Sequence, residues 1–149
     1  MSRLELPLIP KRLQSTGDIV LHAELTLEIK TDRGMWEEVT FLVDPGTEMT
    51  TMEAAKARSL DFPLPRKPIP GLMFKGQEVR SGLLRARVAG MDPTEYVFPC
   101  YFLGDPNVAP PAQAKNLLGL TGVINQLRLS FDGRPYPGAQ GGILVVETY

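Results

Sequence analysis

Apolar and polar residues alternate along several short stretches of this chain, which is the pattern of half-buried β-strands. Residues 18–30 alternate most strictly, and their apolar face consists of Leu21, Ala23, Leu25, Leu27 and Ile29. Asp32-Arg33-Gly34 then predicts a hairpin turn into a partner strand at Trp36–Val43. The same patterning predicts further strands at residues 83–88, 96–103, 127–131 and 143–146.

Two short helices are expected among these strands. Residues 50–60, TTMEAAKARSL, hold good helix formers behind Thr50, and Glu53 stands where a capping box places its acid. Residues 121–126 predict the second helix. The stretch FPLPRKPIPG at 62–71 holds four prolines, which exclude both helix and central strand.

Residues 72–79 predict a second hairpin, because Lys75-Gly76 forms a turn signal between two short extended pieces. Many short strands with few helices favour an all-β fold, a compact β-barrel or folded sheet. The sequence contains no internal repeat, and no linker-like stretch divides it into two domains. We therefore expect a single domain over 1–149, with an N-terminal arm at 1–17, a core at 20–131 and a C-terminal strand at 142–148.

Composition narrows the function only slightly. The 149 residues are 43% hydrophobic and 22% charged, which is typical of a folded globular domain. The net charge of −1 gives no reason to expect nucleic acid or a membrane surface as a partner. No apolar run is long enough to span a membrane, and the first residues lack a signal-peptide pattern. Together with a single cysteine, this predicts a cytoplasmic protein.

The usual nucleophiles and metal ligands are scarce. Cys100, in the apolar stretch FPCYF, reads as a buried small hydrophobe. His22 is the only histidine, and it falls on the polar face of the strand predicted at 18–30. These counts argue against Ser-His-Asp, Cys-His and zinc chemistry, so we expect no metal and no cofactor.

The segment Phe41-Leu42-Val43-Asp44-Pro45-Gly46-Thr47 carries the candidate chemistry. An apolar strand ends in an acid, and Pro-Gly then bends the chain, because Pro fixes φ and Gly permits a positive φ. Asp44 is thus placed at the end of a strand next to the hydroxyl of Thr47. Such a carboxylate either caps a turn or serves as a catalytic acid or base.

A second segment, Asn116-Leu117-Leu118-Gly119, is followed by the short helix expected at 121–126 and the strand at 127–131. The two segments in this order, VDPGTEMTTM and LLGLTGVINQLRLSFDG, resemble the retropepsin-like aspartic proteases, the single-domain relatives of pepsin. Bacterial members look most similar, and the resemblance extends from about residue 20 to 131. It implies an acid-protease-like barrel and an aspartic endopeptidase.

What the resemblance implies can be stated residue by residue. Asp44 would be catalytic, Gly46 would direct its N–H to the carboxylates, Thr47 would bond the outer oxygen, and Gly119 would support the loop. The chain has one such acid, so a catalytic pair needs a homodimer with Asp44 on the twofold axis. A flap would close over a peptide or protein substrate, with Gly71, Gly76 and Gly82 as candidate hinges, and its residues would be Gly71, Leu72, Met73, Phe74, Lys75 and Gly76.

Pro45 departs from the family pattern, which has Thr or Ser at this position. Proline offers neither a hydroxyl nor an N–H to tie two active-site loops together across a dimer. A non-catalytic peptide- or protein-binding module of the same fold is therefore the first alternative. The second is an all-β interaction domain outside the family, in which Asp44 only caps a turn.

Overall fold

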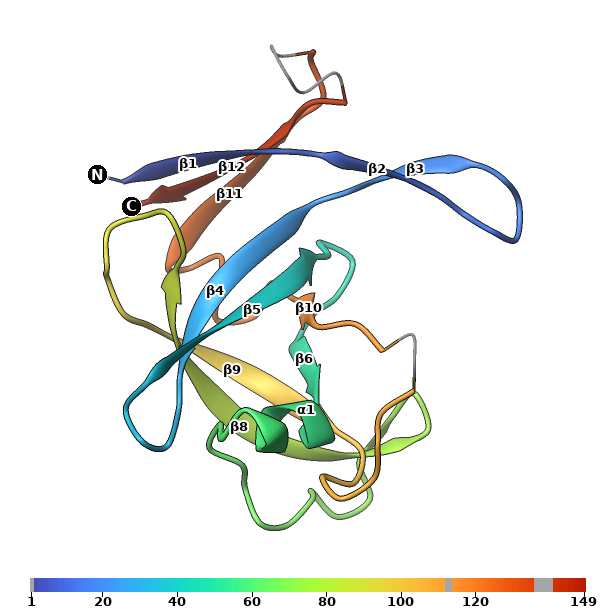
Figure 1. Ribbon diagram of the computed structural model, residues 1–149, viewed down its shortest axis with the longest axis vertical. Coiled ribbons are helices and arrows are strands. Elements are labelled where there is room, and N and C mark those ends of the chain that lie inside the picture. Colours follow the sequence, from blue (N-terminus) through green and yellow to red (C-terminus); the bar gives the residue numbers. More distant parts are fainter. Residues whose placement is uncertain (1, 112–113, 136–140) are drawn as a thin grey trace.

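A closed ring of six strands forms the body of the protein in the computed structural model, which describes residues 2–111, 114–135 and 141–149 (Figure 1). The ring follows the order β4-β5-β10-β6-β9-β8, and β8 returns to pair with β4. Its elements are β4 (Glu24–Lys30), β5 (Trp36–Val43), β6 (Thr50–Glu53), β8 (Gln77–Val88), β9 (Tyr96–Leu103) and β10 (Leu117–Leu118).

Side chains of this ring fill a single main core. Burial alternates along β4, whose inner face buries Leu25, Leu27 and Ile29 completely or nearly so. Phe41 of β5 and Phe98 of β9 are fully buried among them. Closure of the ring leaves few unpaired strand edges around this core.

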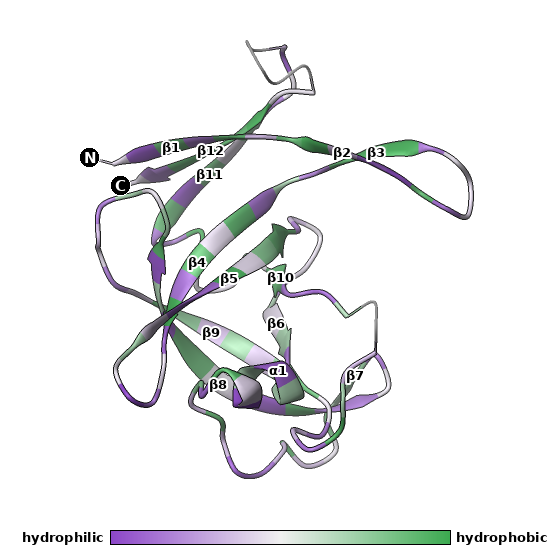
Figure 2. Ribbon diagram, viewed as in Figure 1, coloured by the Kyte–Doolittle hydropathy of each residue, from purple (hydrophilic) through white to green (hydrophobic). Residues whose placement is uncertain are grey.

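Two smaller sheets lie beside the ring. The N-terminal β1 (Arg3–Pro7) pairs with β12 (Ile143–Thr148), which also pairs with β11 (Leu127–Asp132). The hairpin of β2 (Ile9–Arg12) and β3 (Ile19–His22) projects from the body (Figure 1). Figure 2 shows apolar residues along this projecting hairpin.

The predicted all-β fold is confirmed, with one short helix, α1 (Ala54–Ser59). The strand bounds predicted at 36–43 and 96–103 are those observed for β5 and β9. The hairpin predicted at 72–79 is observed as β7 (Met73–Phe74) and the start of β8. Lys75 and Gly76 form its turn, with φ of 51° and 75°. No helix in the described part of the chain is long and apolar enough to cross a membrane.

The prediction of a capping box at Thr50 was wrong. Residues 50–53 form strand β6, and the helix begins only at Ala54, behind Glu53, which makes no side-chain capping bond. The Thr50 hydroxyl is instead fully buried and accepts a hydrogen bond from the N–H of Gly119 at 3.1 Å. Pairing with β9 and β10 therefore overrides a local helix signal.

Two further expectations need correction. Residues 121–126 form consecutive turns, not a helix, although the N–H of Ile124 bonds to Leu120. The stretch 18–30 is divided into β3 and β4 at residue 23, and Leu21 is 50% exposed. It leaves the core face because β3 pairs with β2 and not with β5.

Candidate active site

The backbone of Asp44 is anchored where β5 ends. Alternation along β5 turns Phe41 and Val43 into the core and Thr40 and Leu42 to the other face. Asp44 follows Val43 and donates its N–H to the carbonyl of Leu118 in β10 at 3.1 Å. Two residues beyond Leu42, its half-buried side chain belongs to the face of β5 that is turned away from the core.

Both carboxylate oxygens of Asp44 accept hydrogen bonds from its own loop. The N–H of Gly46 donates to Oδ1 at 2.9 Å, and the hydroxyl of Thr47 donates to Oδ2 at 2.9 Å. The N–H of Thr47 also bonds to the carbonyl of Asp44 at 3.0 Å, which closes the turn. The first contact is that of an ordinary Asx turn, whereas the second fixes the plane of the carboxylate as well.

Gly46 is needed for the space beside the carboxylate and not for a positive φ, which glycine permits but this turn does not use. Gly46 is absent from the residues with positive φ among those described. A Cβ at this position would lie 3.2 Å from Oδ1 of Asp44, a distance tighter than ordinary contact. A side chain here would therefore crowd the carboxylate at the point where the N–H of Gly46 reaches it.

The far end of this loop is held by the segment after β10. We call residues 44–49 the Asp44 loop. The N–H of Leu120 donates to the carbonyl of Thr47 at 3.1 Å, and that of Thr121 donates to Glu48 at 2.8 Å. Gly119 permits this approach, because a Cβ there would lie 2.5 Å from the carbonyl carbon of Met49. Residues 118–121 thus hold the Asp44 loop from one end to the other.

A hairpin stands over a cavity on the same sheet. We call residues 71–79 the flap hairpin and the space beneath it the flap cavity, which has a volume of about 440 Å³. The hairpin carries the predicted flap residues, and Met73 is 61% exposed. Gly82 lies inside β8, where a Cβ would lie 2.8 Å from the Phe102 ring. The cavity is lined by Thr51, Glu53, Lys75, Gln77, Leu103, Pro111, Ala114, Lys115 and Leu117.

Register connects the flap cavity with Asp44. Leu117 of β10 pairs with Leu42 of β5 on one side and with Thr51 of β6 on the other. Residues in register on neighbouring strands project their side chains from the same face of a sheet. Since Leu42 and Asp44 are two residues apart, the carboxylate, Leu117 and Thr51 share that face.

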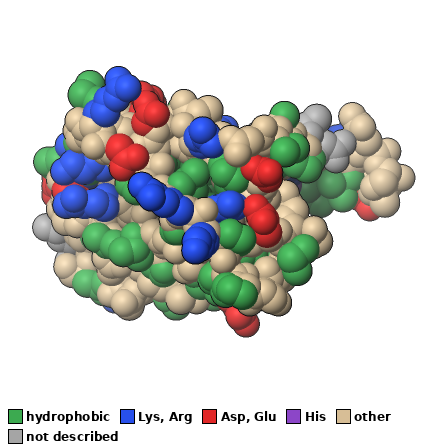
Figure 3. Space-filling model, turned by 90° about the horizontal axis from the view of Figure 1, so that it is seen from below, with side chains coloured by type: hydrophobic (Ala, Val, Ile, Leu, Met, Phe, Trp, Pro, Cys, Tyr) green, Lys and Arg blue, Asp and Glu red, His purple; other side chains and the backbone are tan. Residues whose placement is uncertain are grey.

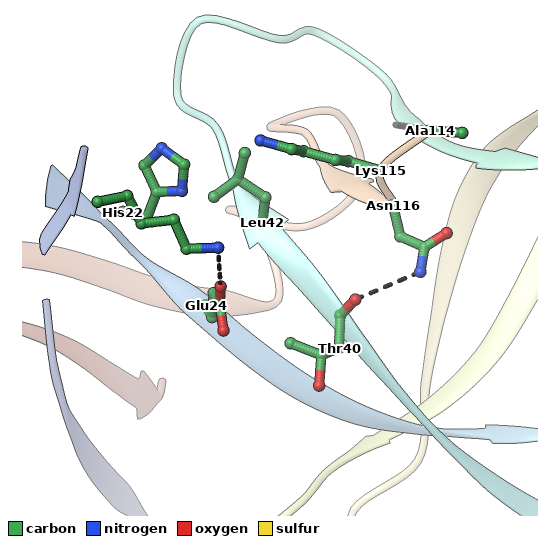
Figure 4. Close-up of a pocket in the computed structure, with 8 residues that line it drawn as sticks. His22, Glu24, Thr40, Leu42, Ala114, Lys115 and Asn116 are labelled. Atoms are coloured by element: carbon green, nitrogen blue, oxygen red, sulfur yellow. Dashed lines mark hydrogen bonds and ion pairs between the residues drawn. The ribbon is translucent and has the colours of Figure 1, made fainter. Parts of the chain in front are cut away.

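A second cavity, of about 210 Å³, lies on the other side of residues 114–115, and we call it the basic cavity (Figure 4). Leu42 and Thr40 line its floor, and Asn116 bonds to β5 through its Nδ2, which donates to the carbonyl of Thr40 at 3.3 Å. His22, predicted on a polar strand face, is half-buried here. Figure 4 shows Lys115 reaching over Leu42 toward His22.

Sequence reasoning missed Lys115, and it named Asn116 only as the first residue of the segment 116–119, without a role in the site. Both stand in the stretch before β10, which has no periodic pattern to place them. Asn116 also accepts the N–H of Leu42 at 2.8 Å through its carbonyl. Only the position of β10 between β5 and β6 brings this segment beside Asp44, and that position is not readable from either segment alone.

Other chemistry-bearing groups lie elsewhere. Burial raises the pKa of the Cys100 thiol well above its usual range, so this side chain stays protonated and is a poor nucleophile. A third cavity is lined in part by Asp32, Arg58, Arg66 and Arg80. Asp32 comes before the start of β5, whereas Asp44 comes directly after its end. Figure 3 shows basic, acidic and apolar side chains mixed on the face seen from below. No cluster of His, Cys, Asp and Glu among the described residues is arranged to hold a metal ion.

One solved structure gives this geometry a context. The fold is similar to that of a retropepsin-like aspartic protease from Rickettsia conorii, with a TM-score of 0.58 and 11% sequence identity over 99% of this chain and 93% of that one. No protein-family model matches the sequence. No curated protein matches it either. The similarity therefore establishes an acid-protease-like fold, and the activity has to be argued from the site.

Proposed function

We propose that the protein is an aspartic endopeptidase of retropepsin type, in which two copies of Asp44 from a homodimer activate a water molecule. The observation that carries the proposal is the carboxylate of Asp44, held at both oxygens at the end of β5. It is supported by a fold similar to that of a retropepsin-like aspartic protease. Under this proposal residues 1–149 act as one retropepsin-like domain.

The chemistry needs two carboxylates and no cofactor. Two such groups in contact cannot both ionise cheaply, so the pair holds one proton. The ionised member takes a proton from the water, and the water oxygen attacks the peptide carbonyl carbon. The protonated member gives its proton to the carbonyl oxygen. The carbon–nitrogen bond then breaks, and a proton passes to the leaving amine. Each chain supplies one Asp44, so the second must come from another copy.

The flap cavity would hold a side chain of the peptide substrate. It lies on the same sheet face as Asp44, and its wall includes the apolar side chains of Leu103 and Leu117. The flap hairpin would close over the bound peptide and exclude water, as closing loops do in other enzymes. Gly71 and Gly76, both with φ near 75°, would be its hinges, whereas Gly82 sits packed inside β8.

Asp44→Asn is the direct test of the proposal. Asparagine keeps the shape of the side chain but cannot accept the proton of water, so hydrolysis of unfolded peptides at acidic pH should fall by roughly a hundred- to ten-thousand-fold. A statine-type transition-state mimic should inhibit the native protein. Initial rates from a fluorogenic peptide library measure both effects. Equal rates in the two proteins would rule out the mechanism.

Pro45 keeps a second candidate function open, a peptide-binding module without turnover. Its side chain is exposed and carries no donor, so a loop-to-loop bond across a dimer is missing. Such a module would bind peptides equally well before and after Asp44→Asn and would hydrolyse none. The reading of Asp44 as a turn cap alone does not account for the two cavities on its sheet face.

Pro45→Thr should strengthen the dimer. Threonine restores a hydroxyl and an N–H at the tip of the Asp44 loop, and a recovered hydrogen bond contributes about 1 kcal/mol. We expect the dissociation constant of the dimer to fall several-fold or more, measured by sedimentation at micromolar concentrations. Pro45→Ala, which restores the N–H alone, is the control and should have a smaller effect. A dimer unchanged or weakened by threonine would contradict a loop-to-loop contact.

A further inference from the structure

The basic cavity holds more positive charge than its one carboxylate neutralises. Lys11 forms an ion pair with Glu24 at 3.3 Å, so these two charges offset each other. Lys115 is exposed and forms no ion pair with any residue that the structure describes. His22 adds an imidazole, and Figure 4 shows it across the cavity from Lys115, with Leu42 between them. One positive charge, that of the Lys115 ammonium group, therefore remains available to bind an anion in this cavity.

The position of the cavity connects it to the proposed reaction. Its floor residue Leu42 stands two positions before Asp44 on the same face of β5, a separation of about 7 Å along the strand. A bound peptide in extended conformation has the same repeat. A side chain in this cavity therefore belongs to a residue within one or two positions of the bond that faces Asp44.

The two cavities differ in character although they share a wall. Ala114 and Lys115 line both of them. Apart from these two residues, the flap cavity is lined by the apolar Leu103, Pro111 and Leu117 together with Glu53 and Lys75. The basic cavity has Leu42 as its large apolar residue, with His22 beside it, and Figure 4 shows the Lys115 side chain reaching over Leu42 toward His22. An extended peptide that crosses residues 114–115 would thus place an apolar side chain in the flap cavity and an acidic side chain in the basic cavity.

We propose that Lys115 is a specificity-determining residue that selects peptides with Asp or Glu in the basic cavity and an apolar residue in the flap cavity. The inference rests on the proposed function, since it assigns the substrate class of the same site. The attraction acts between an ammonium and a carboxylate at a partly exposed position, where salt weakens it. The cavity is too small for a folded domain and takes one side chain.

The experiment compares matched peptides that differ at one position. The peptides carry Glu, Gln or Lys near an apolar residue, and they are amidated at the C-terminus so that the side chain supplies the only carboxylate tested. The rate at which the native protein hydrolyses each peptide is measured. Their binding to the Asp44→Asn variant is measured by fluorescence anisotropy. Both measurements are repeated with Lys115→Gln and Lys115→Glu. Lys56→Glu, at an exposed lysine of α1, is the charge-matched control.

We expect the native protein to prefer Glu over Gln about tenfold, which corresponds to a charge-assisted hydrogen bond in part screened by solvent. Lys115→Gln should remove the preference, and Lys115→Glu should reverse it in favour of Lys. Lys56→Glu should leave it unchanged. The preference should also shrink as the salt concentration rises.

Several outcomes would overturn the inference. In one, the hydrolysis rates of the Glu and Gln peptides differ by less than twofold in both the native protein and Lys115→Glu. Continued hydrolysis in that case would leave the proposed function intact. Another is a Lys115→Glu variant whose dimer constant changes but whose peptide preference does not, which would assign the cavity to a second copy of the chain. Preferential binding without hydrolysis would support the inference and refute the peptidase. Absence of binding to every peptide would overturn both.

Discussion

The Asp44 loop and the flap hairpin differ in how firmly the rest of the molecule holds them. The Asp44 loop is bonded to residues 118–121 through Asp44, Thr47 and Glu48. The flap hairpin has a first strand of only two residues, and that strand pairs with β8 alone. Its turn places Lys75, a residue with a Cβ, at a positive φ.

This difference matches what the two regions are proposed to do. A carboxylate that acts on water needs an orientation fixed before the substrate arrives. A segment that admits a peptide has to open, and segments with few buried contacts open at low free-energy cost. Substitutions in the Asp44 loop should therefore change the stability of the whole fold, whereas those in the flap hairpin should change substrate handling.

Gly119→Ala should have the largest effect on stability. The new Cβ would meet backbone atoms of Met49 and Thr50 at 2.5–2.8 Å, and backbone cannot move aside as a flexible side chain does. We expect a loss of about 3 kcal/mol in the free energy of unfolding, measured by urea denaturation. Gly133→Ala, where nothing lies within 4 Å of the new Cβ, is the control and should be nearly neutral. Equal losses would mean that β10 does not press against the Asp44 loop.

Thr50→Val should cost about 2 kcal/mol of unfolding free energy, since the N–H of Gly119 would lose its buried acceptor. Valine has a similar shape and a high strand propensity, so the loss reports the hydroxyl. Thr26→Val is the control, because its hydroxyl pairs with Thr40 on the exposed side of β4 and β5. We expect less than about 0.5 kcal/mol there. A neutral Thr50→Val would show that this bond does not help to hold the loop.

Gly76→Ala should have the smallest effect on stability and a separate effect on catalysis. Alanine at a φ of 75° costs about 1 kcal/mol. Gly34→Ala in the β4–β5 turn has nearly the same φ and equally open surroundings, so it should cost the same. Only Gly76→Ala should change KM or kcat for a peptide, measured with the fluorogenic library. Equal KM and kcat values in Gly76→Ala and Gly34→Ala would argue against a flap role for this hairpin.

Local signals were enough to predict the strand that presents Asp44. The alternation of β5 and the Pro-Gly pair after it are properties of neighbouring residues, and the bounds at 36–43 were predicted as observed. The same local logic was wrong at Thr50, where Thr50 and Glu53 have the spacing of a capping box. There the pairing of β6 with β9 and β10 overrides the local preference.

The remaining parts of the site depend on contacts between distant segments. Lys115 and Asn116 acquire a place only through the pairing of Leu117 with Leu42. Leu21 continues the alternation of 18–30 yet lies exposed, because its strand changes partner from β5 to β2. Periodicity predicts which residues share a face, but it does not predict which other strand that face meets.

The insertion of β10 between β5 and β6 also sets a time order during synthesis. A ribosome releases residues 36–53 well before 117–121, so the nascent chain holds Asp44 without its clamp until most of the domain has emerged. Until then β5 and β6 have no common neighbour, and the backbone of the Asp44 loop lacks its hydrogen bonds with residues 118–121. A peptidase built in this way would stay inert through most of its own translation.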